Sequence, residues 1–213
     1  MNKKVYLTIS NNVSHEIVIK KSRFICSLSR IHSEDDAKQF IKQVSNANRK
    51  ANHNCFAYMV GDDDHIQRES DNGEPSGTAG VPILESLQLT HVHDVCAVVT
   101  RYFGGIKLGA GGLIRAYSNV TSEALHEAGL VQRVKQAILQ IEVPYSLHDQ
   151  LLYFLKEQQI EIANEEYGVQ VTTNIFVNDD DITSVIDNLN NQFHGQLLIT
   201  EAGHRFNEIP YQE

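Results

Sequence analysis

The stretch that decides the fold is residues 95–118, which read VCAVVTRYFGGIKLGAGGLIRAYS. Its beginning, Val95 to Val99, is apolar without alternation, and this pattern predicts a central strand covered on both faces. A glycine-rich loop follows over residues 104–112. Beyond it, apolar side chains recur at helical spacing and predict a helix: Leu113, Tyr117, Val120 and Ala124. We therefore expect a buried strand that leads into a helix through a loop rich in glycine.

The residues before this stretch predict several strands and two helices. Apolar and β-branched residues cluster in short runs, which are typical of strands. The expected strands cover residues 5–9, 16–19, 24–28 and 55–60. Ser33, followed by three acidic residues, marks the start of a helix. A short helix is expected over residues 82–87, after a first glycine-rich loop at residues 70–80.

A new pattern starts at about residues 130–136. The elements expected from there are a strand, a helix, two strands, a helix and a strand, over residues 137–143, 147–157, 160–167, 169–177, 182–191 and 197–200. This βαββαβ order is the ferredoxin-like plan. The predicted fold class is therefore α+β, with a first domain over residues 1–133 and a ferredoxin-like domain over residues 136–205.

The composition is that of an ordinary globular protein. The chain has 213 residues, of which 41% are hydrophobic and 21% are charged. No apolar run approaches the roughly 20 residues of a membrane-spanning helix, and no apolar signal core follows the lysines at its start. We expect a cytoplasmic protein without a membrane partner.

The three cysteines, Cys26, Cys55 and Cys96, are widely spaced and lie in apolar, strand-like stretches. Free cysteines in such stretches behave as small buried hydrophobes, so no disulfide framework is expected. His53 and Cys55 form a close pair, but no second pair accompanies them as a zinc site would require. We expect neither a bound metal nor a cofactor.

The net charge of −9 is unevenly distributed. Residues 1–135 carry 16 Lys and Arg against 14 Asp and Glu, whereas residues 136–213 carry 2 against 13. Phosphate contacts come mainly from Lys and Arg. A phosphate-binding surface is therefore expected in the first part of the chain, and the acidity of the second part favours solubility.

The second glycine loop predicts an anion-binding site. A loop that leaves a buried strand and enters a helix directs free backbone N–H groups and the positive end of the helix dipole at one spot. Arg101, Lys107 and Arg115 add positive charge there. Glycines that let the backbone approach a ligand closely are Gly104, Gly105, Gly109, Gly111 and Gly112. Alternatively, an arginine of this set pairs with Asp71 or Glu74 and locks the two loops together.

The first glycine loop offers further candidates, namely Glu74, Ser76 and Thr78. Two hydrolase-like pairs also occur. His53 and Cys55 share one face of a strand, and Ser76 lies near Asp71 in the sequence. Neither pair fits a catalytic motif, and a buried structural cysteine is the simpler interpretation, so no catalytic residue is expected. The loops also contain neither a Walker A motif nor a dinucleotide-binding fingerprint.

Four strings of this sequence resemble the signature of a known family. They are NHNCFAY at residues 52–58, GEPSGTAG at 73–80, RYFGGIKLG at 101–109 and GGLIRAY at 111–117. In order and spacing they resemble the IMPACT/YigZ family. The family usually has an aspartate where this chain has Asn72, so this chain lacks that carboxylate.

The resemblance implies a fold for each half of the chain. The first domain is implied to be similar to the second domain of ribosomal protein S5. The second is implied to resemble the last domain of elongation factor G. Eukaryotic relatives restrain a kinase of translation initiation with the help of an additional N-terminal domain. This chain is expected to lack that domain, so the kinase mechanism is not carried over.

The resemblance also implies an association with translation. The leading hypothesis is a regulatory protein that contacts RNA, the ribosome or a translation factor through the glycine-loop face, without DNA sequence specificity. One alternative is a small hydrolase, since some family members carry a dipeptidase label. The other is a purely protein-binding adaptor that docks through its acidic second domain.

Overall fold

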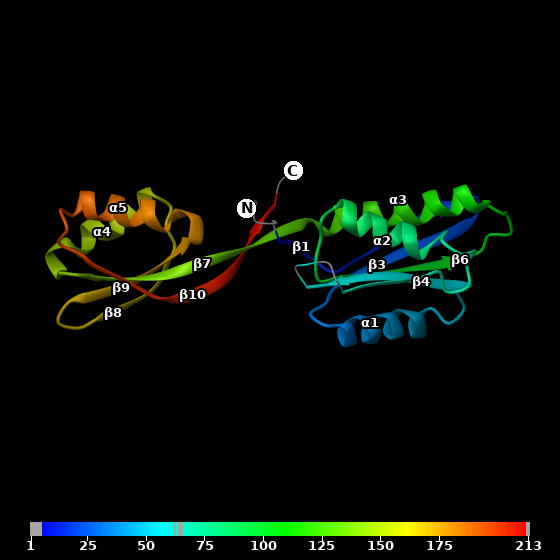
Figure 1. The fold of residues 1–213 in the computed structure, drawn as a ribbon, viewed down its shortest axis with the longest axis horizontal. Helices are drawn as coiled ribbons and strands as arrows, with labels where there is room; N and C mark the ends of the chain where they lie inside the picture. The colour runs from blue at the N-terminus through cyan, green and yellow to red at the C-terminus, as the bar shows by residue number, and fades with distance from the viewer. Residues whose placement is uncertain (1–5, 62, 64–65, 212–213) are drawn as a thin grey trace. The chain divides into compact units, whose positions relative to one another are not determined.

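The computed structural model describes residues 6–61, 63 and 66–211, which form an α+β protein (Figure 1). The chain divides into two compact units. The first runs to Arg133 and takes in the chain again from Ile209, and the second is Val134–Glu208. The predicted α+β class is confirmed. Among the described residues, no helix is both long and apolar enough to cross a membrane.

The first unit is built on an antiparallel sheet with the strand order β2-β3-β6-β4-β5. Its strands are β2 (Val13–Ile19), β3 (Ser22–Arg30), β4 (His53–Val60), β5 (Ile66–Ser70) and β6 (Val95–Tyr102). The central strand is β6, in which every residue except Tyr102 is buried. Its unbroken apolar run predicts this position. The edge strand β5, IQRES in sequence, carries no such signal and was not expected.

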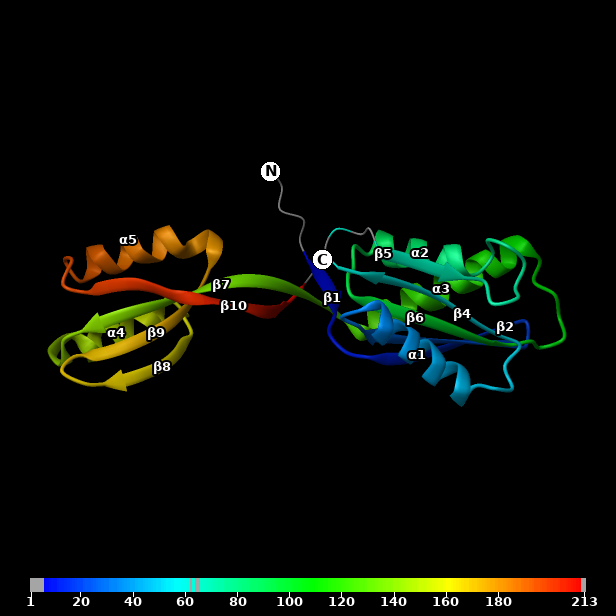
Figure 2. The same cartoon turned by 60° about the horizontal axis from the view of Figure 1, so that its bottom comes forward.

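Helices cover both faces of this sheet, as Figures 1 and 2 show. They are α1 (Glu34–Ala47), α2 (Gly80–Leu89) and α3 (Ala110–Ala128). Successive strand residues point to opposite faces. Val99 therefore belongs to the core beneath α2 and α3, whereas Val98 belongs to the core beneath α1. This is why β6 needs apolar side chains at every position and not at alternate ones.

The start of α1 confirms the expectation from its sequence. The Ser33 hydroxyl accepts a hydrogen bond from the backbone N–H of Asp36 at 3.1 Å. The acidic residues of the first turn lie at the positive end of the helix dipole. A serine cap and an acidic first turn together fix where this helix begins.

The second unit has the expected βαββαβ order and is ferredoxin-like. Its elements are β7 (Leu130–Val143), α4 (Tyr145–Glu157), β8 (Ile162–Tyr167), β9 (Val171–Asn178), η1 (Asp179–Asp181), α5 (Ile182–Gln192) and β10 (Leu198–Pro210). The residues of β7 before Val134 and those of β10 from Ile209 belong to the first unit. The strands β7 and β10 extend well beyond their predicted ranges. The start of β7 pairs with β1 (Leu7–Ile9), a short strand at the beginning of the described chain. Of the predicted strand over residues 5–9, Leu7–Ile9 form β1, Tyr6 lies outside the strand, and Val5 lies outside the described residues.

In the first unit, His15 of β2 contacts two carboxylates of α3. Its Nδ1 lies 2.7 Å from Glu127 Oε2, and its Nε2 lies 2.9 Å from Glu123 Oε2. Both ring nitrogens can donate only when the imidazole is protonated. The hydrogen bonds to Glu127 and then to Glu123 therefore raise the pKa of His15. The protonated ring ties α3 to the sheet.

We expect this contact to make stability depend on pH. A pKa that is raised in the folded state contributes stability that is complete below the unfolded pKa of about 6.5 and is lost as pH rises through the folded pKa. Between about pH 6 and pH 9, the free energy of unfolding should therefore fall more steeply for the wild type than for His15→Gln. Urea unfolding at a series of pH values measures this. Equal slopes for the two proteins would contradict the assignment.

Candidate anion-binding site

The second glycine loop connects β6 to α3 and lies against the turn between β2 and β3. The backbone N–H of Gly104 donates to the Ser22 hydroxyl at 3.1 Å. A Cβ at Gly104 would overlap the backbone of Lys21, so only glycine permits this close approach. At the other end of the loop, Gly109 has φ of 75° and precedes α3 without any side-chain cap. The N-terminus of α3 therefore has no side-chain cap and is exposed at the surface.

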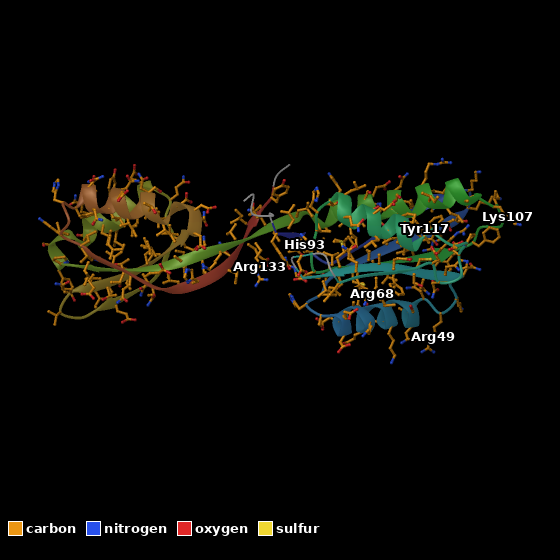
Figure 3. The ribbon with its side chains drawn as sticks, in the orientation of Figure 1. Arg49, Arg68, His93, Lys107, Tyr117 and Arg133 are labelled. Atoms are coloured by element: carbon orange, nitrogen blue, oxygen red, sulfur yellow. The ribbon has the colours of Figure 1, made fainter. Side chains whose placement is uncertain are left out.

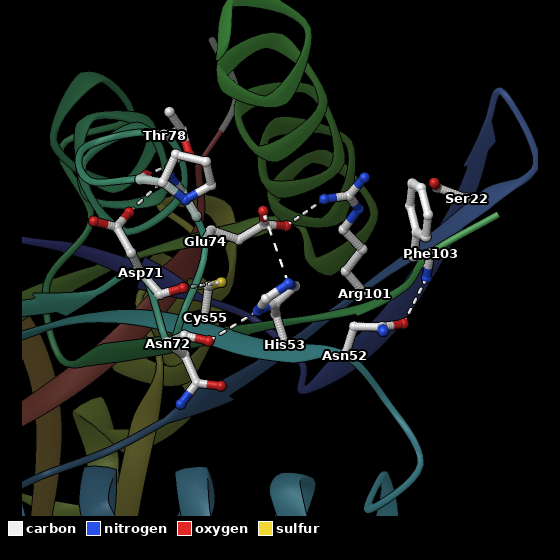
Figure 4. A network of polar contacts seen from close by, with 12 residues as sticks. Ser22, Asn52, His53, Cys55, Asp71, Asn72, Glu74, Thr78, Arg101 and Phe103 are labelled. Carbon is white, nitrogen blue, oxygen red and sulfur yellow. Dashed lines mark hydrogen bonds and ion pairs between the residues drawn. The ribbon is translucent and has the colours of Figure 1, made fainter. Parts of the chain in front are cut away.

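A buried ion pair joins the two glycine loops. Arg101 Nη1 donates to Glu74 Oε1 at 2.6 Å, and the exposed fractions of the two side chains are only 7% and 3%. The hydroxyl of Tyr117 on α3 donates to the same carboxylate oxygen at 2.9 Å. Figure 4 shows Arg101, Glu74 and His53 converging. For Arg101, the structure therefore shows the locking contact that the sequence left as an alternative.

The rest of the first loop is held by Asp71. Its carboxylate accepts hydrogen bonds from the backbone N–H groups of Gly77, Ala79 and Gly80, at 2.8 to 2.9 Å. Partial burial alone would raise the pKa of Asp71, but these backbone hydrogen bonds outweigh it, and the pKa is lowered. The Thr78 hydroxyl donates within the loop, to the Pro75 carbonyl. Among the candidates of this loop, Thr78 and Glu74 are buried, and Ser76 is exposed.

Asn72 keeps an acceptor at the position where the family usually has an aspartate. Its Oδ1 accepts from the backbone N–H of Asn54 at 2.9 Å. Its carbonyl accepts from His53 Nδ1 at 2.9 Å, so in the neutral His53 ring Nε2 is the acceptor. A carboxylate is not needed for either contact, and the departure from the family pattern leaves the loop intact.

A cavity of about 410 Å³ opens beside the ion pair. It is lined by Asn52, His53, Glu74, Pro75, Arg101, Phe103, Lys107, Leu108, Gly109, Ala110 and Leu113. Two of the three predicted cations, Arg101 and Lys107, thus meet at the start of α3. The third, Arg115, is exposed on the first turns of α3 and does not line the cavity. Gly111 and Gly112 follow in the first turn of the helix.

Four further cations lie at the same end of the sheet, in the connections at the ends of its strands. Strand register brings this about, because Ile19 pairs with Ser22 and His53 pairs with Arg101. The β2–β3 turn and the connection from α1 to β4 therefore lie beside the β6–α3 loop. Figure 3 shows Arg49 and Lys107 at this end of the sheet. We call the exposed residues Lys20, Lys21, Arg49, Lys50 and Lys107 the basic edge.

Few carboxylates accompany the basic edge. Residues 17–33, 37–60 and 95–122, which supply these cations, contain no Asp or Glu at all. The nearby Glu74 is buried and is neutralised by Arg101. The basic edge is therefore positively charged, although the protein as a whole is acidic. The individual residues were visible in the sequence, but only the strand register shows that they gather.

The geometry of Cys55 does not suit a nucleophile. Its thiol is buried and donates to the Asp71 carbonyl at 2.9 Å. Burial raises the pKa of Cys55 to about 12, so the reactive thiolate is scarce at neutral pH. Within the described chain, no three His, Cys, Asp or Glu side chains are grouped so that they could hold a metal ion.

The fold and this edge define a two-unit α+β protein with a group of exposed cations on its first unit and a ferredoxin-like second unit. The Impact N-terminal domain family matches residues 20–125, and a domain of unknown function, DUF1949, matches residues 141–196. The chain belongs to the IMPACT family.

The chain is similar to two curated relatives and to one solved structure. The chain is 43% identical to the IMPACT family member YvyE of Bacillus subtilis, over 98% of this chain and 94% of the relative. It is 44% identical to the IMPACT family member YigZ of Escherichia coli, over 51% of this chain and 54% of the relative. A solved structure titled as the crystal structure of a hypothetical protein is 31% identical, with a TM-score of 0.58, and covers 92% of this chain and 97% of its own.

The ion pair of the two loops yields a prediction for stability. Replacing Glu74 with Gln leaves the buried Arg101 charge uncompensated, which typically costs about 3–5 kcal/mol. The exposed pair of Arg23 and Glu16 has the same chemistry at the surface. Glu16→Gln should therefore cost about 1 kcal/mol or less. Urea unfolding of both variants at neutral pH compares them, and similar losses would show that Glu74 is not a lock.

Proposed function

We propose that this protein acts in the cytoplasm as a translation-associated protein that binds RNA through its basic edge. The observation that carries the proposal is the gathering of five exposed cations without an exposed carboxylate among the segments that supply them. Phosphate groups are bound mainly by Lys and Arg, with help from helix N-termini. Both kinds of group lie together at this edge.

The distribution of charge favours a nucleic acid over an acidic protein as the ligand. The cations come from three separate connections, which the strand order β2-β3-β6-β4 places side by side at one end of the sheet. Several cations in neighbouring connections are suited to a polymer that carries regularly spaced phosphates. The acidic second unit, with 2 Lys and Arg against 13 Asp and Glu over residues 136–213, would repel RNA. Binding is therefore directed to one surface of the first unit.

The link to translation comes from the family resemblance. The curated relatives are named only as IMPACT family members, and those names state no activity. The three buried free cysteines are compatible with the reducing cytoplasm. The family resemblance thus supports the role in translation, and the positive charge of the basic edge supports the binding of RNA.

Charge reversal at the basic edge tests the proposal. Lys50→Glu and Lys107→Glu should each weaken binding to purified ribosomes and to single-stranded RNA. The slope of log affinity against log salt should fall by about one for each phosphate group that the variant no longer binds. Lys42→Glu is the matched control, because Lys42 is exposed on α1 and is not part of the basic edge. Fluorescence anisotropy over a salt series gives both quantities, and circular dichroism checks folding.

Other outcomes would support the alternatives. Capture of a protein partner that persists after ribonuclease treatment and at high salt would favour a protein-binding adaptor. Turnover of a peptide panel would favour a hydrolase. Equal RNA affinities for the wild type and the edge variants would place any RNA-binding surface elsewhere.

A further inference from the structure

The cavity beside the Arg101–Glu74 pair combines an anion-accepting end with an aromatic wall. We propose that it binds one nucleoside monophosphate, with the phosphate at the start of α3 and the base against Phe103. The nucleotide is either free or part of an RNA strand on the basic edge. In the second case the inference rests on the proposed function and specifies where one nucleotide of that RNA is held.

The phosphate end is formed by the backbone of α3. Gly112 and Leu113 donate their N–H groups to the Gly109 carbonyl at 3.1 and 2.9 Å. In the part of the chain that the structure describes, the N–H groups of Ala110 and Gly111 find no acceptor. They lie at the positive end of a 19-residue helix, and Lys107 lines the same cavity. Backbone donors, a helix dipole and an ammonium group together match a phosphate.

Arg101 provides an independent indication of a ligand. Its side chain is 7% exposed and lines the cavity, and only its Nη1 is engaged by Glu74. Its Nε is buried and has no hydrogen-bond partner among the described residues. An unsatisfied donor on a buried charged group is unfavourable. A ligand oxygen atom would relieve this cost once a small shift of the guanidinium brings Nε to the cavity surface.

The charges on the cavity wall leave a positive excess. Glu74 is the carboxylate of the lining, and its charge is matched by Arg101 at 2.6 Å. Lys107 then remains without a matching carboxylate on the wall. An anionic group is therefore favoured at the Lys107 end of the cavity.

The other part of the cavity suits a flat ring. Phe103 is 45% exposed, and Leu108, Leu113 and Pro75 add apolar surface. The Arg101 guanidinium lies 5.5 Å from the centre of the Phe103 ring. Bases stack on exposed aromatic rings in proteins that bind single strands. His53 and Asn52 supply polar groups at this wall, with which the edge of a base can form hydrogen bonds. The volume of about 410 Å³ is within the usual range of small-ligand sites.

Isothermal titration of the full chain with AMP, CMP, GMP, UMP and ribose 5-phosphate tests the inference. We expect saturable binding of at least one nucleotide with one-to-one stoichiometry, and weaker binding of ribose 5-phosphate. The absence of saturable binding for all four nucleotides would overturn the inference.

Two variants separate the ends of the site. Ala110→Pro removes one N–H donor at a helical position where proline is well tolerated, and should weaken binding of both ligand types by about tenfold. Phe103→Ala removes the stacking surface. It should weaken nucleotide binding by at least about fivefold while leaving ribose 5-phosphate unchanged. Lys42→Gln is the control, because it removes a positive charge that does not line the cavity. Nucleotide affinities that neither variant changes would overturn the assignment to this cavity.

RNA measurements distinguish this inference from the proposed function. A single-stranded RNA whose binding is weakened by Phe103→Ala identifies the nucleotide as part of the strand. Nucleotide binding without RNA binding would support the cavity as a site for a free nucleotide and contradict the proposed function. Salt-dependent RNA binding without nucleotide binding would leave the proposed function standing and overturn the cavity assignment.

Discussion

The buried ion pair between Arg101 and Glu74 is the constraint on which the surface of the first unit depends. Arg101 ends the central strand, and Glu74 belongs to the other glycine loop. Removing a charge from water is costly, and here the cost is offset by a 2.6 Å contact and by the Tyr117 hydroxyl on α3. One carboxylate thus connects a strand, a loop and a helix, which fixes the cavity wall.

Because of this ion pair, Arg101 has a different role from the exposed cations around it. Because Arg101 is engaged with Glu74, its charge serves mainly to hold the two loops. The groups left for a ligand are the unpartnered Nε of Arg101, the start of α3, the ammonium of Lys107 and the exposed cations of the basic edge. Glycine at position 104 is part of this arrangement, since it lets the loop lie on the Lys21 backbone. The Arg101–Glu74 ion pair, which holds the two loops, therefore lies beside the proposed binding surface.

Elements that are determined by residues close together in the sequence could be predicted. Strands that are stabilised by pairing with a distant strand could not. The helix α1 begins where Ser33 and its acidic neighbours predict, because capping involves residues three apart. The start of β7 was missed because it is stabilised by pairing with β1, far away in the chain. The edge strand β5 was missed for the same reason, since its polar sequence acquires strand structure by pairing with β4.

From the amino-acid sequence alone it follows that β6 is central and that a glycine-rich loop leads from it into the helix α3. These features depend on the residues themselves, through apolar periodicity and the backbone freedom of glycine. Tertiary structure decided that Arg101 is locked by Glu74, while Arg115 remains outside the cavity. It also decided that Lys20, Lys21, Arg49 and Lys50 join Lys107, because hydrogen-bonded register between strands brings together connections that lie far apart in the chain.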